Sequence, residues 1–396
     1  MGLSDRIKAS MAEGSWIRRM FEEGTILKRQ HGDENVFDLS LGNPVMEPPP
    51  QFHEELRKLA NNPQPGMHRY MPNAGYGETR AAVAEHFSQV SGVSFSSDDI
   101  IMSCGAAGAC NVALMTLLNP GDEVIIFVPY FAEYINYIKN CGGIPRLLPT
   151  DEHFLPKLDA FEAAIGPRTR VVIVNSPNNP TGAVYDAGLL QALSDSIRKK
   201  EAQFGAPIYI ISDEAYRRLV YDGVKFPFPL QHHANCITIA SHSKDLALPG
   251  ERIGYIAVHP ECTDHEDLLN GLTFCTRTLG FVNAPALMQN LLRHLQGVSV
   301  SIAEYQKKRD LIYNALSGMG YSIVKPQGAF YVFPRTPIAD DVAFVEEMLE
   351  HLVLVVPGSA FGSPGYFRAS FCVDNDTIES SLDAFSKLAR KYRICH

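Results

Sequence analysis

The sequence lacks the patterns that mark membrane proteins and nucleic-acid-binding proteins. Its 396 residues contain no uninterrupted apolar stretch long enough to cross a membrane as a helix. It also has no long run of Lys and Arg, and its 35 basic and 44 acidic residues give a formal net charge of -9. Because phosphate groups are neutralised by clustered positive charge, this balance argues against a nucleic-acid surface. We therefore expect neither a membrane nor a nucleic acid as a partner.

Cysteine is present, but not in the spacings of a metal or disulfide framework. The eight cysteines form no Cys-x-x-Cys pair and do not adjoin pairs of histidines. This distribution argues against zinc motifs and favours reduced core thiols, as in cytoplasmic proteins. Residues 1–20 have scattered charges and no small-residue cleavage site, so we do not interpret them as a secretory signal. We predict a cytoplasmic protein without a metal site.

What the sequence does contain, over residues 98–258, is an alternation of short apolar runs with helix-like stretches. Runs such as DEVIIFVP, RVVIVNSP and CITIASHS are rich in Ile and Val and nearly continuous in apolar residues. Such runs are typical of strands covered on both faces, and the helical segments between them indicate an α/β fold with a mostly parallel sheet. In such sheets, ligands bind beyond the carboxyl ends of the strands.

The length of the chain predicts two domains. We expect residues 1–50, which end in the Pro-rich segment GNPVMEPPP, to form an N-terminal arm and part of a small domain. Residues 51–285 would form the large domain that carries the sheet, with seven strands between helices. Residues 286–396, with apolar runs such as LVLVVPG among helical segments, would complete a smaller α+β domain.

Polar residues follow several of the apolar runs, at the predicted carboxyl end of the sheet. After Gly105, the N–H groups of Ala106 and Ala107 could face an anion at a helix N-terminus, although small-residue turns also serve tight packing. The two X-Pro bonds within residues 175–182 (NSPNNPTG) are typical of a rigid loop that aims a side chain, or of a plain turn. Asp213 closes another run, and its carboxylate needs either a salt bridge or the positive nitrogen of a ligand.

Lys244 gives these segments a common interpretation. A lysine is usually a solvated surface charge, but this one follows the run CITIA, stands among hydroxyls in SHSK and precedes the segment GERIG with Arg252. The motifs NNPTG and D-x-x-Y come before this segment, and the series of motifs runs from GNP at Gly42 to FRASF at Arg368. The order of these motifs resembles that of pyridoxal-phosphate-dependent aminotransferases. The resemblance is to class I/II, the fold-type I aspartate aminotransferase superfamily, and covers nearly the whole chain.

The resemblance implies that the cofactor is pyridoxal 5'-phosphate and that Lys244 binds its aldehyde as a Schiff base. An imine-forming lysine must spend time as a neutral amine, which a confined site near other positive charge favours. The freed amine would then carry a proton between the substrate and the cofactor. The resemblance pairs Asp213 with the pyridinium nitrogen, and places Tyr216 and Asn179 at the ring's 3-oxygen.

The resemblance also implies how the rest of the cofactor is held. Phosphate binding falls to the N–H groups of Ala106 and Ala107, the hydroxyls of Ser241 and Ser243, and the fork of Arg252. Phe131 would stack on the cofactor ring, or it is a core phenylalanine. Tyr70 matches a tyrosine that reaches the cofactor of the neighbouring subunit, which implies a homodimer with shared active sites.

For the substrate, the resemblance assigns the α-carboxylate to Arg368, because an arginine fork pairs with both oxygens. Gly42 and Asn43 would close over the substrate, or they are turn residues. In dicarboxylate-specific members of the family, an arginine of the partner subunit binds the distal carboxylate of the substrate. Arg277 lies about one residue away from the position that matches this arginine. His242 replaces an apolar or aromatic residue, and it could pack against the ring edge or add a hydrogen bond near the phosphate.

We therefore predict an aminotransferase that moves an amino group from an L-amino acid to a 2-oxo acid, with 2-oxoglutarate and glutamate as one pair. The alternative is a lyase or synthase on the same cofactor, either a carbon–sulfur β-lyase or an enzyme like aminocyclopropane carboxylate synthase, which the segment KDLALPG resembles. A cofactor-binding regulator would need a DNA-binding module before the GNP segment, and we expect none.

Overall fold

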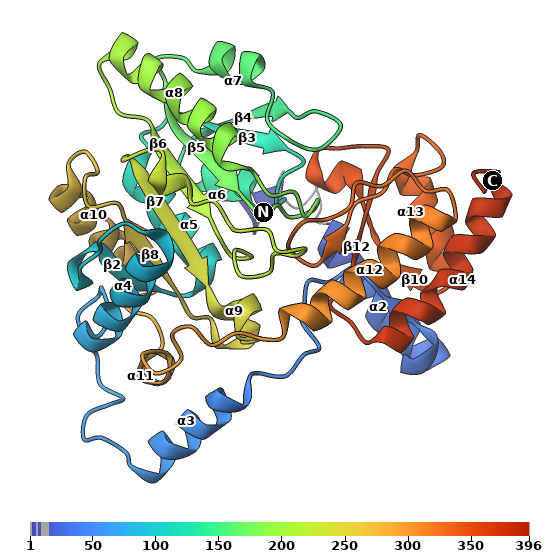
Figure 1. Cartoon of the computed structure of the whole chain (residues 1–396), viewed down its shortest axis with the longest axis horizontal. Coiled ribbons are helices and arrows are strands. Elements are labelled where there is room, and N and C mark those ends of the chain that lie inside the picture. The colour runs from blue at the N-terminus through green and yellow to red at the C-terminus, as the bar shows by residue number, and fades with distance from the viewer. Residues whose placement is uncertain (1, 5–6, 9–15, 396) are drawn as a thin grey trace.

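A seven-stranded sheet dominates one side of the computed structural model, which describes residues 2–4, 7–8 and 16–395 (Figure 1). Within the predicted N-terminal arm, residues 1, 5–6 and 9–15 lie outside the described residues, as does residue 396. In spatial order, the strands are β2 (Ile100–Ser103), β8 (Gly254–Val258), β7 (Cys236–Ser241), β6 (Tyr209–Asp213), β5 (Thr169–Asn175), β3 (Glu123–Val128) and β4 (Ile144–Pro149).

The sheet is parallel except at β8, which runs antiparallel to both β7 and β2. The prediction of a mostly parallel seven-stranded sheet is therefore confirmed. Successive residues of a strand point to opposite faces. Ile210 of β6 packs on one face with Phe87 and Leu193, whereas Ile211 packs on the other with Leu114. Both faces are covered except at the edge strand β4, which is largely exposed, and this coverage explains why the other strands read as continuous apolar runs.

Helices before, between and after the strands cover the faces of the sheet. Side chains from α4, α7, α8 and α11 form the core on one face, and side chains from α5, α6 and α10 form the core on the other. The helices of the described chain are α2 (Trp16–His31), α3 (Pro50–Asn61), α4 (Gly77–Ser91), α5 (Gly105–Leu117), α6 (Tyr134–Asn140), α7 (Leu158–Ala164), α8 (Ala187–Phe204), α9 (His242–Asp245), α10 (His265–Thr278), α11 (Ala286–Leu292), α12 (Ile302–Gly318), α13 (Asp341–Glu350) and α14 (Asn375–Lys391). Within the described part of the chain, every helix is too short or too polar to span a bilayer.

The second region is built from both ends of the chain. From the N-terminal segment, β1 (Phe37–Asp38) pairs in parallel with β10 (Val353–Leu354). Next to them, β11 (Val356–Pro357), β12 (Phe367–Ser370) and β9 (Tyr331–Val332) form an antiparallel sheet in that order. Helices α2, α12, α13 and α14 lie around these strands (Figure 1). The domain boundaries at residues 50 and 285 stay a prediction.

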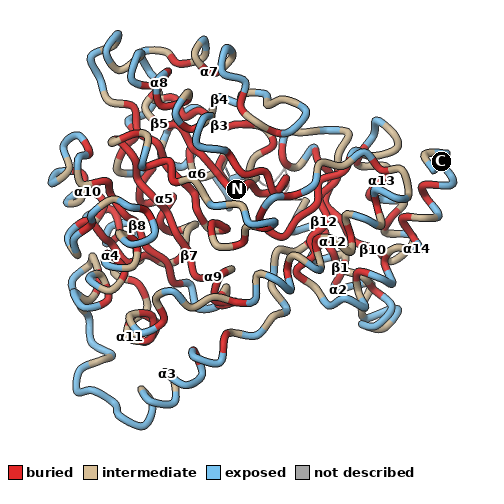
Figure 2. The backbone as a smooth tube through the Cα atoms, viewed as in Figure 1, coloured by how far each residue is buried: buried red, intermediate tan, exposed pale blue. Residues whose placement is uncertain are grey.

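Burial separates these two regions from the segment that links them. Buried residues follow the strands of the large sheet and the inner part of the C-terminal region, whereas α3 is exposed along most of its length (Figure 2). Phe52 is the buried residue of α3. The loop after α3 carries Tyr70, whose exposed fraction is 88%. An exposed helix and loop of this kind leave a surface available on this side of the molecule.

Candidate active site

A cavity of about 270 Å³ lies where the large sheet meets the C-terminal region. The carboxyl ends of β5, β6 and β7 and the start of α5 form one wall, which we call the sheet wall. Gly42, Tyr331 and Arg368, from three distant parts of the sequence, form the opposite wall, which we call the terminal wall. The residues predicted for the site line this cavity, with the exception of Asn43, Tyr70, His242 and Arg277. Parallel strands that end at one edge therefore bring the predicted side chains together.

Lys244 is a buried amine of the sheet wall. It lies on the four-residue helix α9, directly after β7, and its Nζ donates a hydrogen bond to the carbonyl oxygen of Gly42 at 2.6 Å. Burial lowers the pKa of the Lys244 amine to about 8, and the nearby guanidinium groups of Arg252 and Arg368 act in the same direction. A neutral, nucleophilic form is therefore accessible near neutral pH.

Asp213 ends β6 with its carboxylate inside the cavity. The hydroxyl of Tyr134 donates a hydrogen bond to Asp213 Oδ2, and the N–H of Ala215 donates to Oδ1 at 3.2 Å. Burial raises the pKa of Asp213, and these two hydrogen bonds oppose the rise. The sequence left a salt bridge or a ligand nitrogen as the partner, and among the described residues no ion pair involves Asp213. The geometry therefore favours a cationic group on a ligand.

Tyr216 and Tyr331 connect the two walls. Their hydroxyl oxygens are 2.9 Å apart, and both rings pack against Phe330. Burial raises the pKa of both phenols, that of Tyr216 well above its ordinary value, so both hydroxyls stay protonated. Gly42 lies against this pair, and a Cβ at that position would come within 2.0 Å of the Tyr331 hydroxyl oxygen. Glycine is therefore required at position 42 for the segment to pass this close.

A cluster of groups suited to an anion, which we call the anion site, lies at the start of α5. Ala106 and Ala107 line the cavity in the first turn of this helix, where backbone N–H groups lack intrahelical partners. Opposite them, a Cβ at Gly105 would come within 3.1 Å of Arg252 Nη2, so the guanidinium lies directly over the turn. The hydroxyls of Ser241 and Ser243, 2.8 Å apart, also line the cavity. N–H groups, hydroxyls and a guanidinium of this kind suit a phosphate.

Arg368 is a buried cation of the terminal wall. Its Nη1 donates to Asn179 Oδ1 at 3.0 Å and its Nη2 to the carbonyl oxygen of Ser40 at 2.6 Å. The guanidinium lies 4.4 Å from the centre of the Tyr331 ring. Among the described residues, its Nε has no hydrogen-bond partner and no carboxylate pairs with it. Since a buried unpaired charge is costly, this arrangement calls for an anionic ligand.

Four further residues that the sequence singled out lie as follows. Phe131 lines the cavity, half-buried, with its ring edge-to-face against Tyr134, 5.4 Å between centres. Tyr70 is exposed, and Arg277, which is also exposed, lies over Phe274 and does not line the cavity. His242 is buried and does not line the cavity, and its Nδ1 lies 3.2 Å from Asp245 Oδ2; a position near the ring or the phosphate stays a prediction.

Sequence reasoning missed part of the lining. The missed residues are Cys110, Tyr134, Tyr137, Asn175, Ala215, Pro249 and Tyr331. A signal existed for Tyr134, because it lies three residues after Phe131, and for Asn175, which ends an apolar run three residues before the start of NNPTG. No local signal existed for Tyr331, because the run GAFYVF reads as core.

The cavity fits pyridoxal 5'-phosphate together with a carboxylate substrate. Among the described lining residues, Lys244, Arg252 and Arg368 carry positive charge and Asp213 is the acid. The anion site suits the phosphate, the Asp213 carboxylate suits a protonated ring nitrogen, and the orphaned Nε of Arg368 suits a substrate carboxylate. The Lys244 amine lies in the same cavity as all three.

Comparisons with known proteins agree over nearly the full length. Residues 34–385 match the family model described as aminotransferase class I and II. A probable aspartate/prephenate aminotransferase of Thermus aquaticus is 31% identical over 392 residues, 98% of this chain and 99% of that protein. Aromatic-amino-acid aminotransferase 2 of Thermococcus litoralis is 32% identical over 409 residues, 100% of both chains. The crystal structure of an amino transferase from Eubacterium rectale is 39% identical and covers 99% of both chains, with a TM-score of 0.95.

Proposed function

This chain belongs to the class I and II aminotransferases and is a pyridoxal-phosphate-dependent enzyme; from this premise we propose that it moves an amino group from an L-amino acid to a 2-oxo acid. We propose 2-oxoglutarate and glutamate as one of the pairs. One observation carries the proposal: the buried Lys244 amine shares a cavity with Asp213 and with an Arg368 guanidinium that has no carboxylate partner among the described residues.

We propose that Lys244 attaches the cofactor covalently through its ε-amine. Bound pyridoxal phosphate supplies an aldehyde that condenses with amines and a protonated ring that accepts electrons from the breaking bond. With a substrate bound, the Lys244 Nζ would accept the proton of the substrate α-carbon and return it later. Its lowered pKa supports this role, because an amine that titrates near neutral pH both accepts and donates protons.

Asp213 would hold the proton on the cofactor's ring nitrogen. Its buried carboxylate gains most from a cationic partner, since burial disfavours its charge when it is unpaired. The hydrogen bond from Tyr134 fixes the orientation of this carboxylate. Tyr216 and Asn179 would donate hydrogen bonds to the 3-oxygen, and Phe131 would pack on the ring face. These assignments follow the family pattern onto residues that line one cavity.

Arg368 would bind the α-carboxylate that all amino acid substrates share. Selectivity among amino acid side chains must come from other groups. The cationic residues of the described cavity lining are Lys244, Arg252 and Arg368, and each has a role above. A distal carboxylate would therefore need a cation from elsewhere, and Arg277 of a partner subunit stays a prediction for it.

A homodimer with shared active sites is part of this proposal. Tyr70 is 88% exposed and Phe274, beside Arg277, is 55% exposed, which supports a partner surface on this side. We propose that Tyr70 reaches the phosphate in the partner subunit. Location in the cytoplasm and the absence of a nucleic-acid partner stay predictions.

The test is an absorbance spectrum of the purified protein with pyridoxal phosphate and a panel of L-amino acids. Loss of the visible band on adding an amino acid, and its return on adding a 2-oxo acid, is the expected result of two half-reactions. Release of pyruvate and ammonia from a cysteine conjugate, without that return, would instead establish elimination and overturn the proposal.

A further inference from the structure

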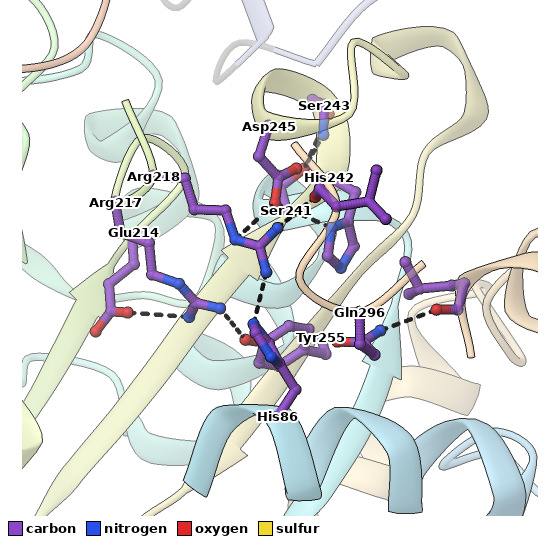
Figure 3. A network of polar contacts seen from close by, with 12 residues as sticks. His86, Glu214, Arg217, Arg218, Ser241, His242, Ser243, Asp245, Tyr255 and Gln296 are labelled. Carbon is purple, nitrogen blue, oxygen red and sulfur yellow. Dashed lines mark hydrogen bonds and ion pairs between the residues drawn. The ribbon is translucent and has the colours of Figure 1, made fainter. Parts of the chain in front are cut away.

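A network of charged residues lies next to the sheet wall (Figure 3). Asp213 is followed by Glu214, and Lys244 is followed by Asp245. Whereas Asp213 and Lys244 line the active-site cavity, Glu214 and Asp245 line a separate small cavity with Arg217 and Arg218. Each cavity-facing residue thus has an acidic neighbour in the chain that points into the network.

Arg218 joins the network to α9. Its Nε lies 3.6 Å from Asp245 Oδ2, its Nη1 donates to the carbonyl oxygen of Val298, and its Nη2 lies 2.6 Å from His86 Nε2 (Figure 3). Arginine nitrogens only donate, so His86 Nε2 accepts. Burial and the charges of Arg218 and Arg217 lower the pKa of His86 to about 4, which keeps it neutral and able to accept. Arg218 is therefore fixed from three directions.

Asp245 is the point where this network holds α9. Its Oδ2 also lies 3.2 Å from His242 Nδ1, and its carbonyl oxygen accepts a hydrogen bond from the N–H of Val300 at 2.7 Å. A helix of four residues has almost no internal hydrogen bonds to maintain it. The contacts of Asp245, together with the Ser241 cap, therefore determine where α9 lies. The position of Lys244 depends on the same contacts.

Glu214 and Arg217 form a second pair beside the first. Glu214 Oε2 lies 3.3 Å from Arg217 Nη1, and Arg217 Nη2 donates to the hydroxyl of Tyr255 on β8 at 2.6 Å. The hydroxyl of Ser212 donates to Glu214 Oε1 at 2.9 Å. Because Arg217 and Arg218 are consecutive, the loop after β6 is tied to β8 on one side and to α9 on the other.

We propose that the Arg218–Asp245 ion pair is a positioning element for Lys244, which fixes α9 against the loop that follows Asp213. His242 supports the pair through its bond to Asp245. This inference rests on the proposed function, in which Lys244 and Asp213 act on one cofactor. Arg218 and Asp245 do not line the active-site cavity, so they would act through the lysine. The network explains why a histidine occupies position 242, where the sequence alone left its role open.

The test uses Asp245→Asn and Arg218→Lys in the holoenzyme. Because small misplacements of reacting groups cost up to about 100-fold in rate, we expect kcat to fall by about 10- to 100-fold. The KM for the amino acid should change less than about 2-fold, because the Arg368 site is untouched. The visible circular dichroism of bound pyridoxal phosphate, which reports its orientation, should change in both variants.

Arg309→Lys is the matched control, because Arg309, like Arg218, is an ion-paired arginine away from the surface; Arg218 is partly buried and Arg309 fully buried. Arg309 Nη2 lies 2.8 Å from Asp222 Oδ1, and Arg309 does not line the cavity. We expect this variant to lose thermal stability while kcat and the visible dichroism stay as in the wild type. The inference is overturned if Asp245→Asn and Arg218→Lys lower the Tm but leave the visible dichroism and kcat unchanged. That result would show that the ion pair only stabilises the fold.

The double variant gives an independent check. If the two residues act as one pair, the kcat of Asp245→Asn/Arg218→Lys should match that of the single variant with the lower kcat. Multiplied losses would overturn the inference. Should Asp245→Asn fail to fold, Arg218→Lys and its dichroism decide alone. If the wild type does not transaminate but the dichroism changes in Arg218→Lys and not in Arg309→Lys, the positioning role stands and the proposed function fails.

Discussion

The two walls of the cavity are built in different ways. The sheet wall takes its residues from neighbouring strand ends, so that Asp213 is the last residue of β6 and Lys244 lies three residues after the end of β7. The terminal wall brings together Gly42, Tyr331 and Arg368, which are close only because β1 pairs with β10 and β12 pairs with β9. Local sequence order thus builds the first wall and tertiary pairing the second.

Their chemistry differs as well. The sheet wall holds the groups that would bind and activate the cofactor, and the terminal wall holds the guanidinium that would bind the substrate carboxylate. Changes in the first wall should therefore lower kcat, and changes in the second should raise KM or lower kcat/KM. The hydrogen bond between Tyr216 and Tyr331 is a direct link between them. The predictions below test whether this division is real.

Lys244→Ala should have the largest effect, because it removes both the covalent anchor and the proton carrier. We expect turnover to fall on the order of 10⁵-fold or more. The far-ultraviolet circular dichroism should stay as in the wild type, since the amine does not hold the core together. Borohydride reduction followed by peptide mapping checks the assignment independently. A labelled peptide that does not contain Lys244 would break the assignment of the sheet wall.

Asp213→Asn should come next. An amide cannot keep the ring nitrogen protonated, so removal of the α-proton should slow by about 10²- to 10⁴-fold. The phosphate site is untouched, so the cofactor should remain bound. Single-turnover measurement of the half-reaction separates this loss from product release. Near-normal turnover would contradict the role of Asp213 and leave the carboxylate as a structural acid held by Tyr134.

Arg368→Lys tests the terminal wall. A lysine cannot reproduce the two-pronged contact, so the loss should be about 1.5–3 kcal/mol, or roughly 10- to 100-fold in kcat/KM. All L-amino acids carry the α-carboxylate, so the loss should be uniform across a panel. Arg277→Ala is the contrasting variant, because a distal-carboxylate role would penalise only aspartate and glutamate. A selective loss in Arg368→Lys would break the division between the walls.

The same division explains what the sequence could predict. Asp213, Lys244 and the first turn of α5 were predictable, because strand periodicity locates the carboxyl edge and the motifs there are local. Tyr331 was not, since a tyrosine within an apolar run reads as core until the strand pairing turns it towards Tyr216. The surroundings of His242 were equally hidden, because Asp245, Arg218 and His86 come from three separate segments.

Tyr331→Phe should have the smallest effect, and it tests whether the walls are linked. The variant keeps the ring against Arg368 but removes the hydroxyl that lies 2.9 Å from that of Tyr216. One such hydrogen bond contributes about 0.5–1.5 kcal/mol, so the effect should be about 2- to 10-fold. If the hydroxyl orients Tyr216 towards the cofactor, the loss falls on kcat and the amino acid KM stays the same.

Tyr305→Phe provides the matched control for this variant. Tyr305 is also buried and stacks on Phe330, 5.9 Å between ring centres, but its hydroxyl has no hydrogen-bond partner in the described chain. Removing that hydroxyl should leave kcat unchanged, because no orienting contact is lost. Equal losses in both variants would trace the effect to packing around Phe330. A Tyr331→Phe variant that raises only KM would confine Tyr331 to the carboxylate site and separate the walls completely.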